Sequence, residues 1–527
     1  MKKLRTISAA AAVLTACTLA GCGNGGNTGS ANLPKGKVSY PIQSEEKVTF
    51  WKGISGNVSS MVATENDLEF TKQLIKNTGV NVEFIHPPIG QEDEKFNLMI
   101  ASGDLADIIE YIPSKTKEGA DKLIDSGYIY ELTDSFMTDY APNFKAKLDA
   151  DSELVKNCKT NNGKFYGFPA WRGNDNMTVY AGIMIRNDWL DELGLDMPKT
   201  IDDWHNVLTQ FKTRKNASVP LSFQGMGPIV QGAFVGAFGT KADFYIQDGK
   251  VKYGPMEDSY KEFLKTFAQW YSEGLIDKNM ASLTKEELDT KVLNGQTGAT
   301  YGMIGSGMGN YLSAAPDNFS LNAAPYPSLA QGGKSEMGFK DFRYYEPATF
   351  IFAGSKNKEL AARFLDYGYS DEGHMFYNFG TEGESYTMKD GYPTFTDKVL
   401  KAEGLSATQA LTKYTHCTYT GAFEMDERFF KQQYTYDEQK EAIDTWLDTN
   451  AGAHMLPGAT CITGDENSEY ARIMADVDTY VSQMTIKYIM CLEPLDSFDS
   501  FKEHIKQLGI ERAIEIKQSG YERYMSK

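Results

Sequence analysis

Short apolar runs alternate with amphipathic segments in the first part of this chain. A β-rich run at 48–51 precedes a segment, 65–77, whose apolar residues recur at helical spacing, and a second apolar run follows at 80–85. This order predicts a βαβ unit with parallel strands. The pattern then repeats, with a helix expected at 92–102 and a strand at 107–111. We therefore expect an α/β domain in which helices cover a parallel sheet.

The middle of the chain continues this α/β pattern, and the C-terminal part is helical. Strands are expected at 179–185 and 298–304. The helices expected in the middle and at the end of the chain span 201–211, 259–272, 359–367, 437–450, 466–488, 497–508 and 511–525. No internal repeat is evident. By the usual size of domains, the 527 residues form two or three of them.

The first 22 residues have the pattern of a secretory signal. Basic residues precede an apolar stretch, 7–20, that is too short for a permanent transmembrane helix. The stretch leads into Leu-Ala-Gly-Cys, which resembles the lipobox of bacterial lipoproteins. The resemblance implies that residues 1–21 are removed and that Cys22 is acylated. Because two or more acyl chains anchor a protein stably, we expect an extracytoplasmic protein attached to the cell membrane through the lipid on Cys22.

A tether follows the lipid site. Residues 22–37 are rich in Gly, Asn and Ser and show no periodicity. This composition is typical of a flexible linker, which would hold the folded part away from the membrane.

The chain is strongly acidic, with a formal net charge of −18, and removal of the basic signal makes it more negative. This charge argues against a nucleic-acid partner and against binding to anionic lipid by charge. Of the six cysteines, Cys158, Cys417, Cys461 and Cys491 belong to the folded part, and none has metal-ligand spacing. An extracytoplasmic location permits disulfides, and the sequence leaves open whether these thiols are paired or free.

No motif indicates catalysis or a cofactor. The Gly-rich run at 301–310 lacks the lysine and the spacing of a P-loop and does not fit a dinucleotide-binding loop. The chain contains no GxSxG or HExxH, and its six histidines are scattered. We therefore expect no cofactor, no metal and no enzymatic activity. A glycoside hydrolase would need two flanking carboxylates, a condition that composition alone does not test in a chain with 71 acidic residues.

Aromatic residues give the clearest indication of a ligand. The chain has 30 Tyr, 29 Phe and 6 Trp. Aromatic rings stack on the apolar faces of sugars, and Asp, Glu and Arg bind sugar hydroxyls. Ligands of open parallel sheets bind at the carboxyl ends of strands. Trp51, which ends the first expected strand, and Trp171, which has no helical context, are therefore candidate ligand contacts, as are Asp107 and Glu110 on the strand at 107–111.

The mature chain resembles the long type of family 1 extracellular solute-binding lipoprotein of bacterial ABC transporters. The most specific match is IMIRNDWLDELGLDMPKTIDDWHNVLTQFK at 183–212, and FNLMIASGDLADIIEY at 96–111 is another. Further matching segments occur in the expected order at 125–134, 163–171, 267–277, 353–373, 379–386 and 520–527.

This resemblance implies a class II periplasmic-binding-protein fold, an α/β fold in which two lobes joined by a hinge close on a ligand in the cleft between them. Lobe 1 would contain 38–170 and 346–400, and lobe 2 would contain 171–345 and 401–527. The crossovers should lie near 170–180 and 343–353. The resemblance also implies a monomer that captures an oligosaccharide and delivers it to ABC transporter permease subunits. A peptide or other small-solute binder, or a ligand sensor, remains an alternative on the same fold.

The resemblance also adds candidate ligand-binding residues. Asp107 matches the strand-end Asp that hydrogen-bonds sugar in maltose-binding-like relatives. Trp171 and Arg172 lie at the first crossover, and Arg343 and Tyr345 lie at the second.

Two further positions come from a stretch that resembles the family's GxEGxxY. Glu382 and Tyr386 occupy its Glu and Tyr positions, and the stretch is either structural or ligand-facing. In some long relatives, alginate-oligosaccharide binders among them, a DxNxNG calcium loop follows the helix equivalent to 201–211. Here residues 212–222 read KTRKNASVPLS and lack the acidic oxygen ligands that Ca²⁺ requires, so we expect no calcium there.

Overall fold

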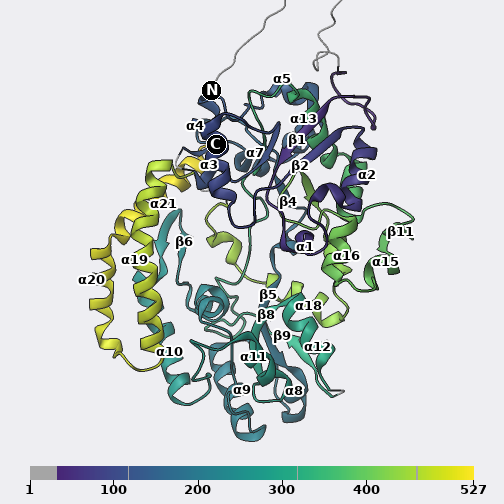
Figure 1. Ribbon diagram of the computed structural model, residues 1–527. Helices are drawn as coiled ribbons and strands as arrows, with labels where there is room; N and C mark the ends of the chain where they lie inside the picture. The colour runs from purple at the N-terminus through teal and green to yellow at the C-terminus, as the bar shows by residue number, and fades with distance from the viewer. Residues whose placement is uncertain (1–32, 117, 317, 459–460) are drawn as a thin grey trace, which may run out of the picture.

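The computed structural model describes residues 33–116, 118–316, 318–458 and 461–527. The expected signal and the lipid site at Cys22 lie outside these residues. Two α/β lobes lie one above the other, and a column of C-terminal helices runs along one side of them (Figure 1). Within the described residues, no helix combines the length and the apolar character needed to cross a membrane.

The first lobe is built on a four-stranded sheet with the strand order β10-β3-β1-β2. Its strands are β1 (Lys47–Trp51), β2 (Asn81–Ile85), β3 (Ile108–Glu110) and β10 (Thr349–Ile351). Strand β1 is parallel to β2 and β3, as the apolar pattern predicts, and β10 is antiparallel to β3. The parallel pairing aligns the carboxyl ends of β1 and β3 at one edge of the sheet.

Helices cover both faces of this sheet. They are α1 (Gly56–Ser59), α2 (Glu69–Thr78), α3 (Glu92–Ser102), α4 (Gly119–Asp125), α5 (Asp134–Tyr140), α6 (Pro142–Ala150), α7 (Ser152–Cys158), α13 (Lys358–Asp366) and α14 (Asp371–Phe379). Gly79 ends α2 with a φ of 71°, and a Cβ at this position would lie 2.0 Å from the carbonyl oxygen of Ile42. Only glycine fits both constraints, so Gly79 fixes the turn from α2 into β2.

The second lobe differs from the expected parallel arrangement. Its central strand β5 (Ala181–Arg186) is buried along its whole length and pairs antiparallel with both β8 (Ala299–Met303) and β9 (Leu321–Ala323). Parallel pairing here is limited to single bridges, such as those from Leu221 to Ile276 and Ala299. The apolar pattern predicted β5 and β8 but not β9, and it did not give the direction of any strand, because period and burial are the same in either orientation.

Helices and a hairpin surround this second sheet. They are α8 (Asn187–Leu193), α9 (Ile201–Arg214), α10 (Asp258–Ser272), α11 (Lys285–Leu293), α12 (Asn310–Ala314), α18 (Asp437–Leu447) and the hairpin β6 (Phe244–Gln247) to β7 (Lys250–Tyr253). The core includes three fully buried tryptophans, Trp204, Trp270 and Trp446. The indole of Trp446 packs directly on Gly182 and donates to the carbonyl oxygens of Ile183 and Ala324.

Residues 401–431 belong to the first lobe, which corrects the expected division at residue 400. Their elements, together with the preceding hairpin, are β11 (Tyr386–Lys389), β12 (Tyr392–Phe395), α15 (Asp397–Leu400), α16 (Ala407–Tyr414), β13 (Phe423–Met425) and α17 (Glu427–Lys431). Helix α16 packs against α1 and α2, and β13 pairs in parallel with β4 (Ala170–Arg172). Leu411 and Phe429 are buried with Phe379 in a small core of the first lobe, so apolar burial holds the segment there.

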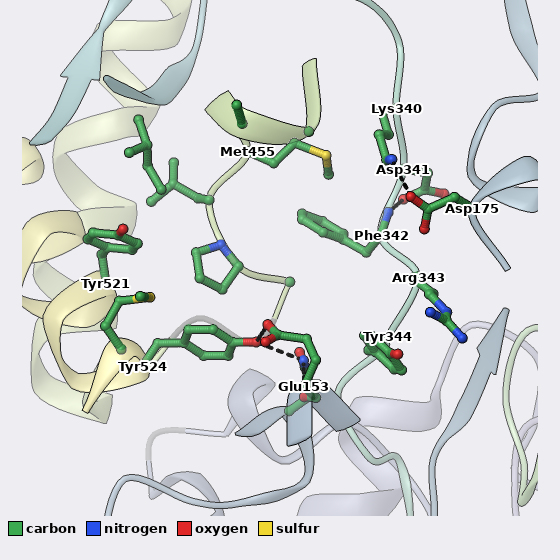
Figure 2. Close-up of a pocket in the computed structure, with 18 residues that line it drawn as sticks. Glu153, Asp175, Lys340, Asp341, Phe342, Arg343, Tyr344, Met455, Tyr521 and Tyr524 are labelled. Atoms are coloured by element: carbon green, nitrogen blue, oxygen red, sulfur yellow. Dashed lines mark hydrogen bonds and ion pairs between the residues drawn. The ribbon is translucent and has the colours of Figure 1, made fainter. Parts of the chain in front are cut away.

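The C-terminal helices join the two lobes. Helices α19 (Gly464–Ile489), α20 (Phe498–Leu508) and α21 (Ile510–Met525) pack on the second lobe, and the end of α21 reaches α7 of the first. The Tyr524 hydroxyl accepts a hydrogen bond from Asn157 at 2.8 Å and donates one to Glu153 (Figure 2). The lobes are thus connected here as well as through the crossovers.

A buried charged group lies at the carboxyl ends of β1 and β3. The Lys52 ammonium lies 3.3 Å from a Glu65 carboxylate oxygen and 3.8 Å from one of Glu110. His416 packs nearby, with Nε2 2.9 Å from the carbonyl oxygen of Thr420. Burial, reinforced by the positive charge of Lys52, lowers the pKa of His416 to about 3. His416 is therefore neutral at physiological pH and its Nε2–H can donate to Thr420, which holds the loop at 416–421 in place.

Replacing Tyr524 with Phe tests the contact between α21 and α7. The change removes a hydroxyl that both accepts and donates a hydrogen bond, and it should lower the free energy of unfolding by about 1 kcal/mol. Tyr521→Phe on the same helix is the matched control, because its hydroxyl makes no comparable bridge to the first lobe. Equal unfolding midpoints in urea for the two variants would contradict this role of Tyr524.

Replacing His416 with Gln tests its burial in the neutral form. The folded-state pKa of His416 lies below its ordinary value of 6.5, so the unfolded chain binds the proton more readily. The contribution of neutral His416 is complete above pH 6.5 and is lost as the pH falls from 6.5 toward 3. Between neutral pH and about pH 5, the wild type should lose roughly 2 kcal/mol of stability more than His416→Gln. Parallel pH profiles of stability for the two proteins would contradict the shift.

Candidate functional site

A cavity of about 540 Å³ lies between the lobes beside the crossovers. Both lobes and both crossovers contribute to its wall, and we call it the interlobe cleft. Its aromatic lining comes from Tyr180, Tyr345, Tyr419, Phe430 and Tyr434, and its aliphatic lining from Met177, Val179, Met303 and Ile443.

The interlobe cleft meets the carboxyl ends of strands from both sheets. In the second lobe, Met303 ends β8, and Ser306 just beyond it also lines the cleft. In the first lobe, Tyr419 precedes Thr420, whose hydroxyl donates to Glu110 at 2.9 Å, at the carboxyl end of β3. This is the position at which α/β sheets bind their ligands.

An ion pair between the crossovers lies in the wall of the cleft. Arg172, only 2% exposed, donates to a carboxylate oxygen of Asp341 at 2.8 Å and to the carbonyl oxygen of Phe342. The same Asp341 oxygen accepts a hydrogen bond from the Tyr180 hydroxyl at 2.9 Å. One pair thus links the first crossover, which contains Arg172 and Tyr180, to the second.

Three tyrosine rings surround the Arg172 guanidinium. Its central carbon lies 4.9 Å from the ring centre of Tyr345, 5.5 Å from that of Tyr419 and 5.7 Å from that of Tyr180. These are cation–π distances. Burial raises the pKa of Tyr180 to about 12 and also raises that of Tyr345, so both hydroxyls stay protonated and can donate hydrogen bonds.

A second ion pair lies at the first-lobe side of the cleft. Lys431 contacts Glu427 at 2.5 Å, one helical turn away on α17. The Glu427 carboxylate also accepts hydrogen bonds from Asn174 at 2.6 Å and from Asn176 at 3.0 Å. Both charges of this pair are therefore already engaged by protein groups.

A second hollow extends the interlobe cleft. It has a volume of about 270 Å³ and shares Tyr419, Phe430 and Gln433 with the cleft. The rings of Tyr419 and Phe430 are stacked, with centres 6.3 Å apart, and Tyr419 is 51% exposed. These two rings line both hollows, and we call them the stacking platform.

A separate cavity of about 480 Å³ lies between the second crossover and α21 (Figure 2). Its polar side chains are engaged with the protein. Lys340 pairs with Asp175 at 2.9 Å, and Arg343 donates to the carbonyl oxygens of Arg172 and Gly173. The described residues that line it include none from the two central sheets, so the interlobe cleft is the better candidate for the ligand site.

The two candidate tryptophans are core residues, contrary to expectation. Trp51 is 6% exposed and packs near Phe96 and Tyr111. Trp171 is 3% exposed, and its ring stacks on Tyr369 at 5.2 Å. Neither lines the cleft, because both indoles point into the first lobe.

The two candidate acids on β3 have structural partners. Asp107 precedes β3 rather than ending it, which corrects the expectation, and its carboxylate accepts hydrogen bonds from Thr49 and Ser355. Glu110 does lie at the carboxyl end of β3, but its carboxylate bonds to Thr420 and lies near Lys52. Glu110 is therefore not part of the cleft lining but holds Thr420, which follows the lining residue Tyr419.

Among the crossover and hairpin candidates, Arg172 and Tyr345 line the cleft. Arg343 lines the cavity behind the second crossover instead. Glu382 is exposed next to β11, and Tyr386 is buried against Phe379 in the small core of the first lobe. Neither residue of the GxEGxxY-like stretch is among those that line the interlobe cleft.

Sequence reasoning missed the aromatic residues at 419–434, including Tyr419, Phe430 and Tyr434. A signal was present, since aromatic residues are dense between 414 and 436 around the turn at Gly421. The segment was overlooked because no resemblance or strand end marked it.

The described residues show no metal or disulfide chemistry at this site. Among them, no group of three or more His, Cys, Asp or Glu side chains is arranged to hold a metal ion. Cys158, Cys417 and Cys491 are free thiols, and Cys417 borders the second hollow.

Comparison with known proteins identifies relatives along the whole chain. In an alignment of 557 positions it is 25% identical to the fructooligosaccharide ABC transporter substrate-binding protein FusA of Streptococcus pneumoniae, with 99% of each chain covered. It is 27% identical to lipoprotein LipO of Bacillus subtilis, over 74% of this chain and 75% of LipO. The crystal structure of alginate-binding protein AlgQ2 without calcium matches with a TM-score of 0.68 at 25% identity, covering 92% of this chain and all of that one.

The fold and the family agree with the sequence analysis. The match to AlgQ2 confirms the α/β solute-binding-protein fold. The model of the bacterial extracellular solute-binding protein family matches residues 63–375, which is more than half of the chain. The protein therefore belongs to the family of bacterial extracellular solute-binding proteins.

Proposed function

We propose that this protein captures an oligosaccharide in the interlobe cleft and delivers it to the permease subunits of an ABC importer. The observation that carries the proposal is the aromatic lining of the cleft, to which both lobes and both crossovers contribute. Sugar rings stack on such faces through their C–H groups, while tyrosine hydroxyls bond to sugar hydroxyls. The names of FusA and AlgQ2, each a binder of oligosaccharide or polysaccharide, support this ligand class.

Binding would act through lobe closure about the crossovers. We place the first lobe at 38–170 and 346–431 and assign the second lobe to most of the remaining folded chain. Closure would bring Tyr419 and Phe430 of the first lobe toward Met303 and Ser306 of the second. A ligand that touches both sides favours the closed state by its additional contacts there.

The cleft binds without chemistry in this proposal. Its two carboxylates, Asp341 and Glu427, are each engaged by a cation and by further donors. A glycosidase would need one carboxyl group free to protonate the leaving oxygen and a second one free to act on the sugar. The arrangement favours a binding protein over a hydrolase.

Acylation of Cys22 would keep the binding protein at the outer face of the cell membrane, next to its permease. The sequence pattern at residues 1–22 supports this anchor, and the relative LipO is named a lipoprotein. We propose that the protein works as a monomer, with one cleft for each chain.

A thermal-shift screen of residues 23–527 against oligosaccharides tests the ligand class. A ligand at about one hundred times its Kd adds about 2.7 kcal/mol to the free energy of unfolding, so a bound sugar should raise the melting temperature clearly. A shift with peptides and none with any sugar would contradict the proposal and favour a peptide binder on the same fold.

Replacing Tyr419 with Ala tests the location of the site. The side chain is half exposed, so the fold should tolerate its loss, while the stacking platform disappears. The Kd for the sugar found in the screen should rise at least about tenfold, which is about 1.4 kcal/mol. Tyr392→Ala is the matched control, because Tyr392 is a 39% exposed tyrosine on the β11–β12 hairpin outside the cleft. Unchanged affinity in Tyr419→Ala by calorimetry would place the site elsewhere.

A further inference from the structure

We propose that the ligand is an uncharged oligosaccharide and that the interlobe cleft discriminates against uronates and other anionic sugars. This inference rests on the proposed function and narrows its ligand class. It depends on how the charged groups of the cleft are arranged, which similarity to relatives does not reveal.

Arg172 is not available to an anionic ligand. Its guanidinium is committed to Asp341 and to the carbonyl oxygen of Phe342. Tyr345 and Tyr419 lie within cation–π distance of it. A sugar carboxylate would bind best to the two terminal nitrogens, but Asp341 already accepts from Nη2 and the Phe342 carbonyl oxygen accepts from Nη1.

Lys431 is also paired, although its side chain is 42% exposed. Its ammonium pairs with Glu427, and two asparagine side chains, Asn174 and Asn176, hold that carboxylate. The two asparagines therefore hold the Glu427 carboxylate in the position where it pairs with Lys431. Among the described residues that line the cleft, Arg172 and Lys431 are the Lys and Arg residues, and Asp341 and Glu427 are the acidic ones. The lining is thus balanced in formal charge.

Binding an anion here would be costly. The ligand carboxylate would have to displace Asp341 or Glu427, leaving a partly buried carboxylate without its cation, or enter the cleft without a partner of its own. Either course leaves a desolvated charge without a partner, which weakens the binding of the anion. The net charge of −18 adds repulsion at longer range.

The polar groups of the cleft that take part in no ion pair are suited to bind the neutral hydroxyls of a sugar. The Ser306 hydroxyl and the Gln433 amide line it and can both donate and accept, as sugar hydroxyls do. Three tyrosine hydroxyls of the cleft stay protonated because burial raises their pKa: those of Tyr345, Tyr419 and Tyr434. The second hollow is also uncharged, because His416 is neutral at physiological pH. The whole elongated site therefore offers aromatic faces and neutral hydrogen-bonding groups.

Calorimetry with two matched sugar panels tests this inference. One panel contains neutral fructo-, gluco-, manno- and xylo-oligosaccharides, and the other contains short galacturonate, mannuronate and guluronate oligosaccharides. We expect a neutral sugar to bind residues 23–527 at least about one hundredfold more tightly than any uronate. Its Kd should change less than about twofold between about 20 mM and 300 mM NaCl, since no ligand charge is screened.

The possible outcomes separate this inference from the proposed function. Tightest binding of a uronate, weakening with salt, would overturn the inference while sugar binding stands. Binding of neither panel would overturn the proposed function and the inference together.

Two variants test the stated cause of the selectivity. Asp341→Asn removes the carboxylate that neutralises Arg172, and Glu427→Gln does the same for Lys431 at an independent position in case the first variant misfolds. Each should lower the ratio of uronate Kd to neutral-sugar Kd at least about tenfold, because a cation becomes free for the ligand. An unchanged ratio in both folded variants would overturn the proposed charge balance.

Discussion

The ion pair between Arg172 and Asp341 is the interaction on which the site depends. It joins the two crossovers at the point where they pass between the lobes, and Tyr180 donates to the same carboxylate. The rings of Tyr345, from the second crossover, and Tyr419, from the first lobe, both lie within cation–π distance of the Arg172 guanidinium. Such a buried charge persists only with its partner, so the pair holds the two crossovers together, and in our proposal it also keeps the cation from binding the ligand.

The first lobe supports its side of the cleft through a second polar group. Glu110 at the end of β3 accepts from Thr420, and neutral His416 lies within hydrogen-bond distance of the Thr420 carbonyl oxygen. These contacts hold the loop that carries Tyr419. Glu110, a candidate ligand contact in the sequence analysis, thus holds the loop whose Tyr419 lines the cleft. The ligand-facing surface is left to aromatic rings and neutral polar groups, a composition that favours stacking and hydroxyl recognition over charge recognition.

Much of the fold was predictable from periodicity, and much of the site was not. The parallel unit of β1, α2 and β2 and the cap at Gly79 follow from local patterns, since burial period and backbone conformation are local properties. The direction of β8 and the placement of 401–431 depend on which distant surface each segment covers. The same holds for Trp171, whose ring packs in the core of the first lobe against Tyr369.

A crystal structure of the protein with its tightest-binding neutral oligosaccharide tests the central claim most directly. The account predicts sugar rings stacked on Tyr419 and Phe430 in the interlobe cleft, residues of both lobes in contact with the ligand, and an intact pair between Arg172 and Asp341. Ligand density in the cavity between the second crossover and α21, or a sugar group bound to Arg172 in place of Asp341, would contradict it.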